Sequence, residues 1–294
     1  DMSKDNSLSL LKKISGIKII DNKTNLGFLL SCNKAAKKSS GKYIYFLNND
    51  TEVTKGWLDE LIFVFKSFDK VGLVGSKLIY PDGKLQEAGG IVWNDGSAWN
   101  FGRNQDISLP EYNYIREVDY CSGASILVEK DLFFKLGGFD EKYIPAYCED
   151  TDFCFKVRSA GYKVFYQPFS LVVHHEGISH GRNLDSGIKS FQSKNQKTFF
   201  REWKNILAKN HFEPGKQLSF AKDKSKIKGR VLIIDHCVPE FDKDAGSRTI
   251  FMWIKLLVKL GFGVKVWPHN QYYNQRYVEV LQRMGVEVIY NNHN

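Results

Sequence analysis

The sequence predicts an α/β protein, and three observations lead to that prediction. Short β-branched or aromatic runs alternate with helical patterns from Ile17 to about Gln167, which is typical of a sheet covered by helices. The same alternation resumes at Val231, after a polar and basic stretch. Hydrophobic residues make up 43% of the 294-residue chain, enough to build packed cores. Two unequal domains are therefore expected.

In the first region the patterns place strands and helices in alternation, and Gly161 suits the left-handed cap that ends a helix. Residues 93–114 are rich in Gly, Asn and aromatic side chains, which indicates a long functional loop. The expected strands are 17–20, 43–47, 71–76, 125–128 and 163–166, and the expected helices are 28–38, 57–68, 130–136 and 150–160.

The second region begins after a composition change. Residues 210–229 are polar, basic and interrupted by Pro214 and Gly215, as in a linker. Residues 230–294 then read as strand, helix, strand, helix and strand, at 231–235, 247–260, 264–267, 273–284 and 286–289. This order is the start of a Rossmann-like domain, too short to complete a doubly wound sheet. The expected domains are thus 1–209, a linker at 210–229, and a partial domain at 230–294.

Bulk properties exclude several classes of protein. No apolar run approaches the roughly 18 residues of a membrane span, and residues 1–5 do not resemble a signal peptide. Five cysteines without a CxxC spacing favour neither a disulfide framework nor a zinc site, so a reducing cytoplasm is expected. The net charge of +9 suits any anion. Part of this charge lies in one basic run, which is interpreted as a solvated linker. The run comprises Lys222, Lys224, Lys226, Lys228 and Arg230.

The first chemical motif follows the strand predicted at 43–47. The strand delivers Asn48, Asn49 and Asp50 to its carboxyl end, where open α/β sheets bind ligands. A carboxylate there could hold Mg²⁺ or Mn²⁺, which stabilise the charge of a departing diphosphate. A plain Asn/Asp turn after a strand is the alternative interpretation.

A second motif, YCEDTD, opens the helix predicted at 150–160. Glu149 and Asp150 could simply be acids that favour a helix N-terminus. The functional interpretation is that one of them is a general base for a hydroxyl group, with a pKa raised by the clustered acids.

The third motif is VVHHEGIS at residues 172–179. His174 and His175 follow an apolar run, and two successive histidines near a possible carboxylate ligand favour an imidazole ligand for Mn²⁺. A structural histidine is the alternative.

Taken in order, these pieces resemble the family 2 glycosyltransferases of bacterial polysaccharide synthesis, which have the GT-A fold. The resemblance extends from Asp1 to about Trp203. The matching segments are NLGFLLSCN with Asn25, Gly27 and Asn33, LNNDT, Gly56-Trp57-Leu58, YPDGKLQEAGG at 80–90, CSGA at 121–124, GGFDEKY from Gly137, and EDTDFCFKVRSAGYKVFYQP from Glu149.

The resemblance implies a mixed, mainly parallel sheet and a role for each matching residue. Asp50 and His174 would bind Mn²⁺ or Mg²⁺, with His175 as the second choice of histidine. Asp150 would be the base and Glu149 would position the acceptor beside Trp57. The donor would contact Asn25, Gly27, Asn48, Asn49 and Gly123.

Two departures from the family pattern stand out. Asn48 replaces the first aspartate of the usual metal motif, and residues 1–7 resemble a turn that normally follows about 35 residues of strand, helix and strand. An internal fragment is therefore expected. Residues 228–257 resemble the opening of a GT-B glycosyltransferase domain through Asp235, His236 and the segment 244–247. A Gly before a helix N-terminus there suits a phosphate or a sugar acceptor.

These features together predict an inverting, metal-dependent transferase of the hexosyl or rhamnosyl type. It would use a UDP- or dTDP-sugar and a glycan or lipid-linked acceptor, in the cytoplasm or against the inner membrane face, with peripheral membrane contact left open. The alternative is a degenerate domain that binds a glycan or partner without turnover. A nucleic-acid partner rests on charge alone and is not expected.

Overall fold

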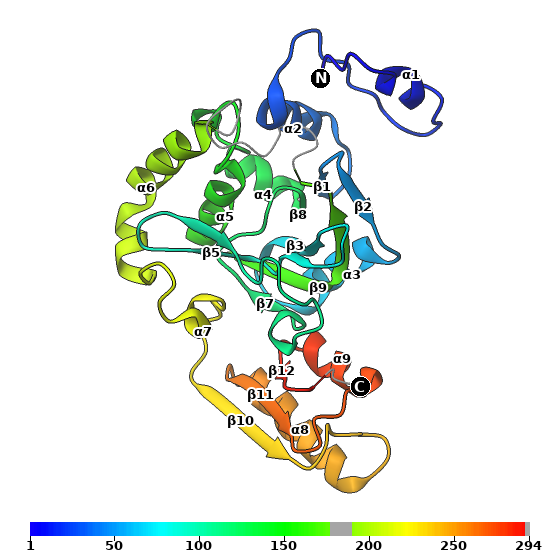
Figure 1. Ribbon diagram of the computed structural model, residues 1–294, viewed down its shortest axis with the longest axis vertical. Helices are drawn as coiled ribbons and strands as arrows, with labels where there is room; N and C mark the ends of the chain where they lie inside the picture. The colour runs from blue at the N-terminus through cyan, green and yellow to red at the C-terminus, as the bar shows by residue number, and fades with distance from the viewer. Residues whose placement is uncertain (177–189, 292–294) are drawn as a thin grey trace.

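The computed structural model describes residues 1–176 and 190–291, which form two α/β units arranged along the long axis of the molecule (Figure 1). An extension with the short helix α1 (Ser7–Leu11) projects from one end, and the smaller unit lies at the other. No helix among the described residues is long and apolar enough to cross a bilayer.

The larger unit is built on a mixed sheet. Within the described residues seven strands belong to it, in the order β1-β8-β3-β9-β2, with β4 paired to β3 and β7 paired to β9. A separate hairpin is formed by β5 (Gly90–Val92) and β6 (Ala98–Asn100). The sheet strands are β1 (Tyr43–Leu47), β2 (Thr51–Val53), β3 (Val71–Ile79), β4 (Leu85–Glu87), β7 (Arg116–Glu117), β8 (Ser125–Glu129) and β9 (Lys163–His174).

Helices cover both faces of this sheet. One face packs against α3, and the other packs against α2, α4 and α5, with α6 outside α5 (Figure 1). The helices are α2 (Gly27–Lys38), α3 (Trp57–Ser67), α4 (Lys130–Lys135), α5 (Glu149–Ser159), α6 (Ser190–Asn210) and α7 (Leu218–Ala221), with 3-10 turns at Pro110–Tyr112 and Glu141–Tyr143.

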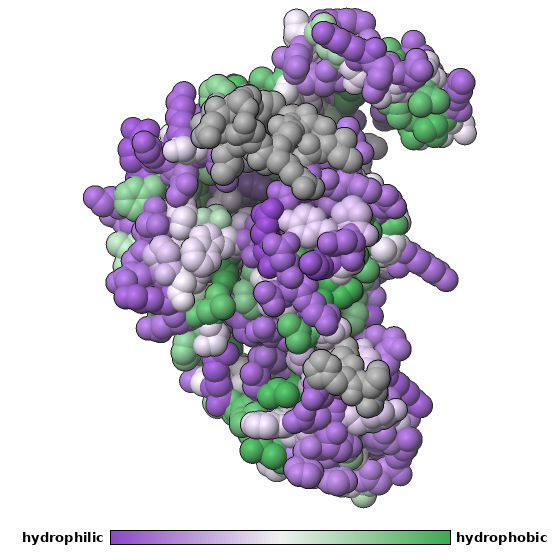
Figure 2. All heavy atoms as spheres, in the orientation of Figure 1, coloured by the Kyte–Doolittle hydropathy of each residue, from purple (hydrophilic) through white to green (hydrophobic). Residues whose placement is uncertain are grey.

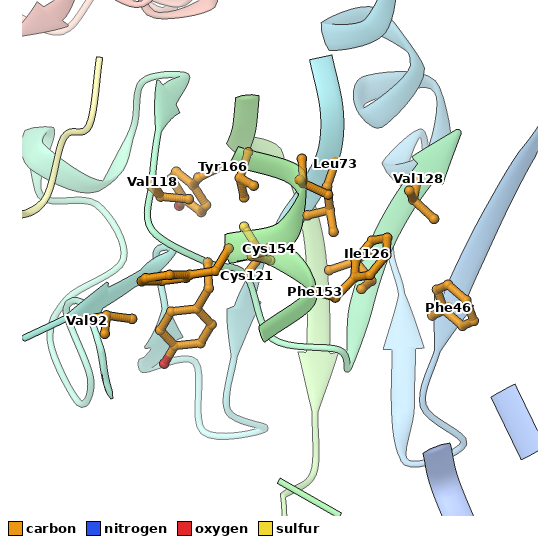
Figure 3. Packing of buried hydrophobic residues seen from close by; sticks show 14 of the residues in the cluster. Phe46, Leu73, Val92, Val118, Cys121, Ile126, Val128, Phe153, Cys154 and Tyr166 are labelled. Carbon is orange, nitrogen blue, oxygen red and sulfur yellow. The ribbon is translucent and has the colours of Figure 1, made fainter. Parts of the chain in front are cut away.

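Strand alternation explains why two cores form. Successive side chains of a strand point to opposite faces, so Leu73 packs toward α4 and α5 while Val74 packs toward α3. On β8, Ile126 likewise packs in the core with α4 and α5, and Leu127 packs in the core with α3. Figure 3 shows the first core, where Leu73, Ile126 and Phe153 lie together in the interior. Strands with continuous apolar runs require a sheet that is buried on both faces.

Close packing under the sheet makes one glycine necessary. A Cβ on Gly75 would lie 2.2 Å from Cys121 Cβ and 2.5 Å from Cys121 Sγ. Cys121 is itself buried, and it lies beside Cys154 in the interior (Figure 3). All five cysteines are free thiols.

The smaller unit contains the three parallel strands expected from the sequence. Strands β10 and β11 pair along their whole length, and β12 joins β11. Helices α8 and α9 bury one face of this small sheet through Ile254, Val278 and Leu281. The elements are β10 (Arg230–Asp235), α8 (Ala245–Lys259), β11 (Gly263–Pro268), α9 (Gln275–Arg283) and β12 (Glu287–Val288).

The two units contact each other through α9 and the residues around β12. The Ile115 amide donates to the Gln282 carbonyl at 3.0 Å, and Tyr290 Oη donates to the Ser108 carbonyl at 3.1 Å. The Arg283 guanidinium lies 4.1 Å from the centre of the Phe169 ring and also pairs with Glu60. These contacts therefore hold the smaller unit against the larger one.

Two expectations about strands are wrong. Residues 17–20 form no strand; they lie on the projecting extension, where Ile17 and Ile19 are exposed and no described strand pairs with them. Figure 2 shows hydrophobic atoms, coloured green, at the surface of this extension. The sheet is also not mainly parallel. Among the described pairings of this sheet only that of β3 with β9 is parallel. Strand β8 lies between β1 and β3 and runs antiparallel to both.

Two expectations about irregular segments also need correction. Residues 93–114 were expected to be a long functional loop, but they include β6 and a 3-10 turn and bury Trp93, Phe101 and Tyr112 in the main core. The linker at 210–229 contains α7 and is only partly solvated. Lys222 is 6% exposed and lies 3.5 Å from Glu287, while Lys224 Nζ lies 3.3 Å from the buried Asp119. These contacts tie the basic run to both units.

Candidate active site

Strand pairing brings Asp50 and His174 together. The turn after β1 carries Asp50 directly into β2, and β2 pairs with β9 so that Thr51 lies opposite His174. The His175 amide donates to the Asp50 carbonyl at 2.9 Å, which extends the same ladder. As a result Asp50 Oδ1 lies 3.3 Å from His174 Nε2.

The structure distinguishes the two histidines. His174 is mostly buried, and burial lowers its pKa against the opposing effect of Asp50, so its ring is neutral at neutral pH. His175 turns away and contacts Glu52 Oε1 at 2.7 Å near the surface. His174 is therefore the imidazole beside Asp50. Of the motif at 172–179, residues 177–179 lie outside the described part of the chain.

The Asp50 and His174 pair offers one carboxylate and one imidazole to a metal ion. Among the residues that the structure describes, no group of three or more His, Cys, Asp or Glu side chains is arranged to hold an ion. Two protein ligands still fit a divalent cation that takes its other ligands from a bound diphosphate and water. The Asn48 Oδ1 atom, buried without a hydrogen-bond partner among those residues, adds one more oxygen beside this turn.

The acidic pair lies at the N-terminus of α5, where Cys148 caps the helix in a left-handed conformation with φ +72°. Asp150 Oδ2 accepts from the Gly123 amide at 2.9 Å, and Oδ1 accepts from the Thr151 amide at 2.6 Å. Burial raises the pKa of Asp150, while these hydrogen bonds oppose the rise. Asp150 is thus an oriented carboxylate that binds a proton more readily than one in water.

Its neighbour Glu149 is 6% exposed, and burial followed by repulsion from Asp150 raises its pKa to about 8. In the described part of the chain its Oε2 atom has no hydrogen-bond partner. Glu149 is therefore protonated at neutral pH and can donate a hydrogen bond.

One turn links the two acidic centres. The Ala124 carbonyl accepts from the Asn48 amide at 3.0 Å, beside the Asp50 turn. The preceding Gly123 donates to Asp150. A Cβ on Gly123 would lie 3.4 Å from Asp150 Cβ and 3.6 Å from Phe28 Cζ, so this backbone is enclosed. Residues 121–124, which we call the CSGA turn, therefore fix the spacing between the Asp50 side and the Asp150 side.

The remaining predicted residues are less closely assembled. Asn25 Oδ1 accepts from the Gly27 amide at 3.0 Å, and Asp1 Oδ2 accepts from the same amide at 2.8 Å, so both cap α2. Trp57 packs on the cluster of Leu78, Ala124 and Val172, beneath the CSGA turn. Asn49 is exposed.

The structure adds residues that the sequence analysis quoted in a motif but gave no role. Gln86 Oε1 lies 2.9 Å from His174 Nδ1, and Glu87 Oε1 accepts from the Ser122 amide at 2.9 Å. Glu176 accepts from Tyr80 and Arg103. The sequence signal for Tyr80, Gln86 and Glu87 was the matching segment at 80–90, in which polar residues precede an apolar run.

The chain is similar in sequence to several known proteins. Residues 1–130 match the model of the family described as glycosyl transferase family 2. The chain is 34% identical over 154 residues to the O-antigen biosynthesis protein RfbC of Myxococcus xanthus, covering 50% of this chain and 12% of that protein. It is 24% identical over 204 residues to the N-acetylglucosaminyl-diphospho-decaprenol L-rhamnosyltransferase of Mycobacterium tuberculosis, covering 60% of this chain and 65% of that protein.

A solved structure shares the fold. The crystal structure of GalNAc-T7 with UDP, GalNAc and Mn²⁺ has a TM-score of 0.53 and 17% identity, and the match covers 70% of this chain and 41% of that one. The larger unit therefore has the GT-A fold expected from the sequence. This chain spans less than two thirds of each of these relatives. Residues 1–130 of the chain are thus similar to the glycosyl transferases of family 2.

Proposed function

We propose that this chain transfers a sugar from a nucleotide donor to an acceptor hydroxyl, with inversion at the anomeric carbon. The observation that carries the proposal is the CSGA turn. It is bonded to Asn48 on one side and to Asp150 on the other, at 3.0 Å and 2.9 Å. A donor sugar lying on this turn would have its diphosphate toward Asp50 and its anomeric carbon toward the base.

In the proposed reaction Asp150 takes the proton of the acceptor hydroxyl as that oxygen attacks the anomeric carbon. The bond between the anomeric carbon and the diphosphate oxygen breaks on the opposite face. The products are the new glycoside and a nucleoside diphosphate. A single displacement needs no protein nucleophile. The protonated Glu149 donates to an acceptor oxygen and so holds it near Asp150.

Asp50 and the neutral His174 are the residues that would hold Mn²⁺ or Mg²⁺, which acts as a Lewis acid for the charge on the leaving diphosphate. Asn48 lies beside them with its Oδ1 atom unsatisfied among the described residues. An amide in place of the first aspartate lowers the negative charge of the site by one. The donor contacts would be completed by Asn25, Gly27 and Asn49.

The substrate proposal is a hexosyl or rhamnosyl group delivered from a UDP- or dTDP-sugar to a glycan or lipid-linked acceptor of a surface polysaccharide. It is supported by relatives whose names include O-antigen biosynthesis and L-rhamnosyltransferase. A cytoplasmic location at the inner membrane face follows from such an acceptor, and the net charge of +9 suits an anionic surface.

For the smaller unit we propose the GT-B likeness noted in the sequence. Parallel strands β10 and β11 end at Asp235 and Pro268, and α8 begins nearby with Asp244 accepting from the Ser247 amide at 2.8 Å. The carboxyl edge of a parallel sheet is where such domains bind ligands. A second nucleotide or acceptor site at this edge would be detected by a change in nucleotide binding in Asp235→Ala.

The direct test measures nucleoside diphosphate release from a panel of UDP-, dTDP- and GDP-sugars, with acceptor glycans, in Mn²⁺ or in EDTA. Release is expected in Mn²⁺ only, and it should be lost in Asp50→Ala and Asp150→Asn. A matched control is Asp242→Asn in the smaller unit, where the carboxylate accepts from Tyr277, and it should keep full release. Absence of release from every donor would favour the alternative, a domain that binds a glycan or partner without turnover.

A further inference from the structure

Both ring nitrogens of His174 have fixed neighbours. Nε2 faces Asp50 Oδ1 at 3.3 Å, and Nδ1 faces Gln86 Oε1 at 2.9 Å. A neutral imidazole carries one hydrogen, which can sit on either nitrogen. Only the form with the hydrogen on Nδ1 leaves the Nε2 lone pair directed toward the Asp50 side. Gln86 Oε1 and the Asp50 carboxylate are both acceptors, so they compete for this hydrogen, and the acceptor beside Nδ1 decides whether the Nδ1–H form is available when a cation occupies the Asp50 side.

The Gln86 amide is held in one orientation. Its side chain lies on β4 and is 2% exposed. Its Nε2 group donates to Glu176 Oε2 at 3.2 Å. A carboxylate only accepts, so the amino half of the amide must face Glu176 and the carbonyl half must face His174.

Glu176 is itself held by two further donors. Tyr80 Oη donates to Glu176 Oε2 at 2.9 Å, and Arg103 Nη2 donates to the same oxygen at 2.9 Å and to Oε1 at 3.2 Å. Both carboxylate oxygens of Glu176 therefore act as acceptors, Oε1 for Arg103 and Oε2 for Arg103 and Tyr80. The chain of hydrogen bonds therefore runs from Arg103 through Glu176 and Gln86 to His174, in one direction.

We propose that Gln86, oriented by Glu176, is a positioning residue that fixes the Nδ1–H form of His174 and directs Nε2 toward Asp50. This inference rests on the proposed function, since it concerns how the same site holds a divalent cation. A histidine ligand generally donates its other N–H to a fixed acceptor, and loss of that acceptor costs about 10- to 100-fold in metal affinity. In the sequence, Gln86 lies beside Glu87 in the motif at 80–90.

The first test reads the hydrogen position without metal or substrate. Nitrogen-15 NMR of histidine-labelled, metal-free Asp50→Ala protein at pH 7.5 separates the two neutral forms by their ring shifts, and His174→Gln identifies the signal. The Asp50 carboxylate is removed because it would itself accept from Nε2–H. In this protein His174 is expected in the Nδ1–H form, and adding Gln86→Leu should remove the preference, because Nδ1 then has no acceptor. An Nε2–H form in the Asp50→Ala protein would overturn the proposal.

The second test exchanges the two partners. Gln86→Glu combined with Glu176→Gln again presents an acceptor oxygen to Nδ1 and an amide N–H to that acceptor. The double variant should recover the Nδ1–H form that Gln86→Leu loses, which a loss of packing alone would not explain. Gln105→Leu, at an exposed glutamine of the neighbouring segment, is the matched control.

The third readout is Mn²⁺ binding in the presence of UDP, followed by the free-ion EPR signal. Gln86→Leu should weaken binding about 10- to 100-fold, and the exchanged pair should restore most of it. Unchanged binding in Gln86→Leu would refute the positioning role. None of these readouts is sugar transfer, so a protein that fixes His174 but transfers no sugar would refute the proposed function and leave this inference standing.

Discussion

Acidic side chains have opposite surroundings in the two units of the chain. In the larger unit Glu87, Glu149 and Asp150 are enclosed, and burial raises the pKa of each. In the smaller unit Asp242 and Asp244 lie at the surface, and hydrogen bonds from Tyr277 and Ser247 lower the pKa of each. The enclosed carboxylates bind a proton more readily than they would in water, and the pKa reaches about 8 for Glu87 and for Glu149, whereas the two surface carboxylates stay charged.

The difference shows where proton chemistry can occur. A general base works best with a pKa near the working pH, and burial achieves this in the larger unit at a cost in stability. The acids of the smaller unit serve local structure: Asp244 caps α8, and Asp242 fixes Tyr277. Both units present polar groups at strand ends, but only the larger one encloses them. Matched changes in the larger and the smaller unit distinguish the enclosed groups from the exposed ones.

The largest effect is expected from Asp150→Asn. An amide oxygen can keep the bond from the Gly123 amide but not also the bond from the Thr151 amide, and an amide cannot take a proton. The kcat for sugar transfer should therefore fall by about 10²- to 10⁴-fold, and the lost hydrogen bond should lower the free energy of unfolding by about 1 kcal/mol. The measurement is the rate of product formation with saturating donor and acceptor. Asp242→Asn, the matched change in the smaller unit, should leave kcat unaltered. Equal losses in both variants would mean that the contrast has no bearing on catalysis.

A smaller effect, on stability, is expected from Glu87→Gln. Burial raises the pKa of Glu87 from 4.5 to about 8. The folded state therefore binds a proton that the unfolded state releases above pH 4.5, so the stabilisation present below pH 4.5 is lost as pH rises toward 8. Gln does not titrate. Relative to the unaltered protein, the variant should gain on the order of 3 kcal/mol between pH 4.5 and 8, measured by urea unfolding at both pH values.

The matched change for Glu87→Gln has the opposite sign. The pKa of Asp242 is lowered by its hydrogen bond to Tyr277, so its stabilisation is present above pH 3.8 and is lost in stronger acid. Asp242→Asn should therefore lower stability at pH 7 and change little at pH 3. If both variants shift in the same direction with pH, the assignment of buried and exposed acids is wrong.

Much of this contrast could not be predicted from the sequence. The acidic pair was recognised as a motif, and Asp50 and His174 were proposed as partners. The family resemblance favoured His174 over His175, and the pairing of β2 with β9, which the sequence did not reveal, sets Thr51 opposite His174 and so brings His174 beside Asp50. Glu87 was quoted in a motif without a role, because its contact with Ser122 joins segments 35 residues apart.

Local patterns misled in two places for physical reasons. Residues 17–20 have the β-branched composition of a strand, but composition does not supply a pairing partner, and the segment is exposed. The run of lysines after 220 resembles a solvated linker, yet Lys222 and Lys224 reach carboxylates that the fold brings from elsewhere. Helices were predicted within one or two residues at most ends, because their apolar periodicity is a local property.

The third prediction concerns Gly75→Ala, beneath the CSGA turn. The added Cβ would meet Cys121 at 2.2 Å, so the turn must shift or the core must open, at a cost of about 1–3 kcal/mol. Since this turn spaces Asp50 from Asp150, kcat should fall as well. Adding Cys121→Gly removes the clash and should recover both unfolding stability and turnover. In the smaller unit Gly246→Ala meets only Asp244 Oδ1, at 3.2 Å, and should be tolerated.

The smallest effect is expected from Asp244→Ala, which removes the α8 cap in the smaller unit. The Ser247 amide loses its acceptor at 2.8 Å and is hydrated instead, because this helix end is exposed. The melting temperature should fall by a few degrees, as measured by circular dichroism, and Asp244→Asn should keep most of it because Asn is also a good cap. Sugar transfer should not change. A loss of transfer in Asp244→Ala without a loss in Asp244→Asn would mean that the cap holds the smaller unit in a position the larger unit needs, and the two units would then share one function.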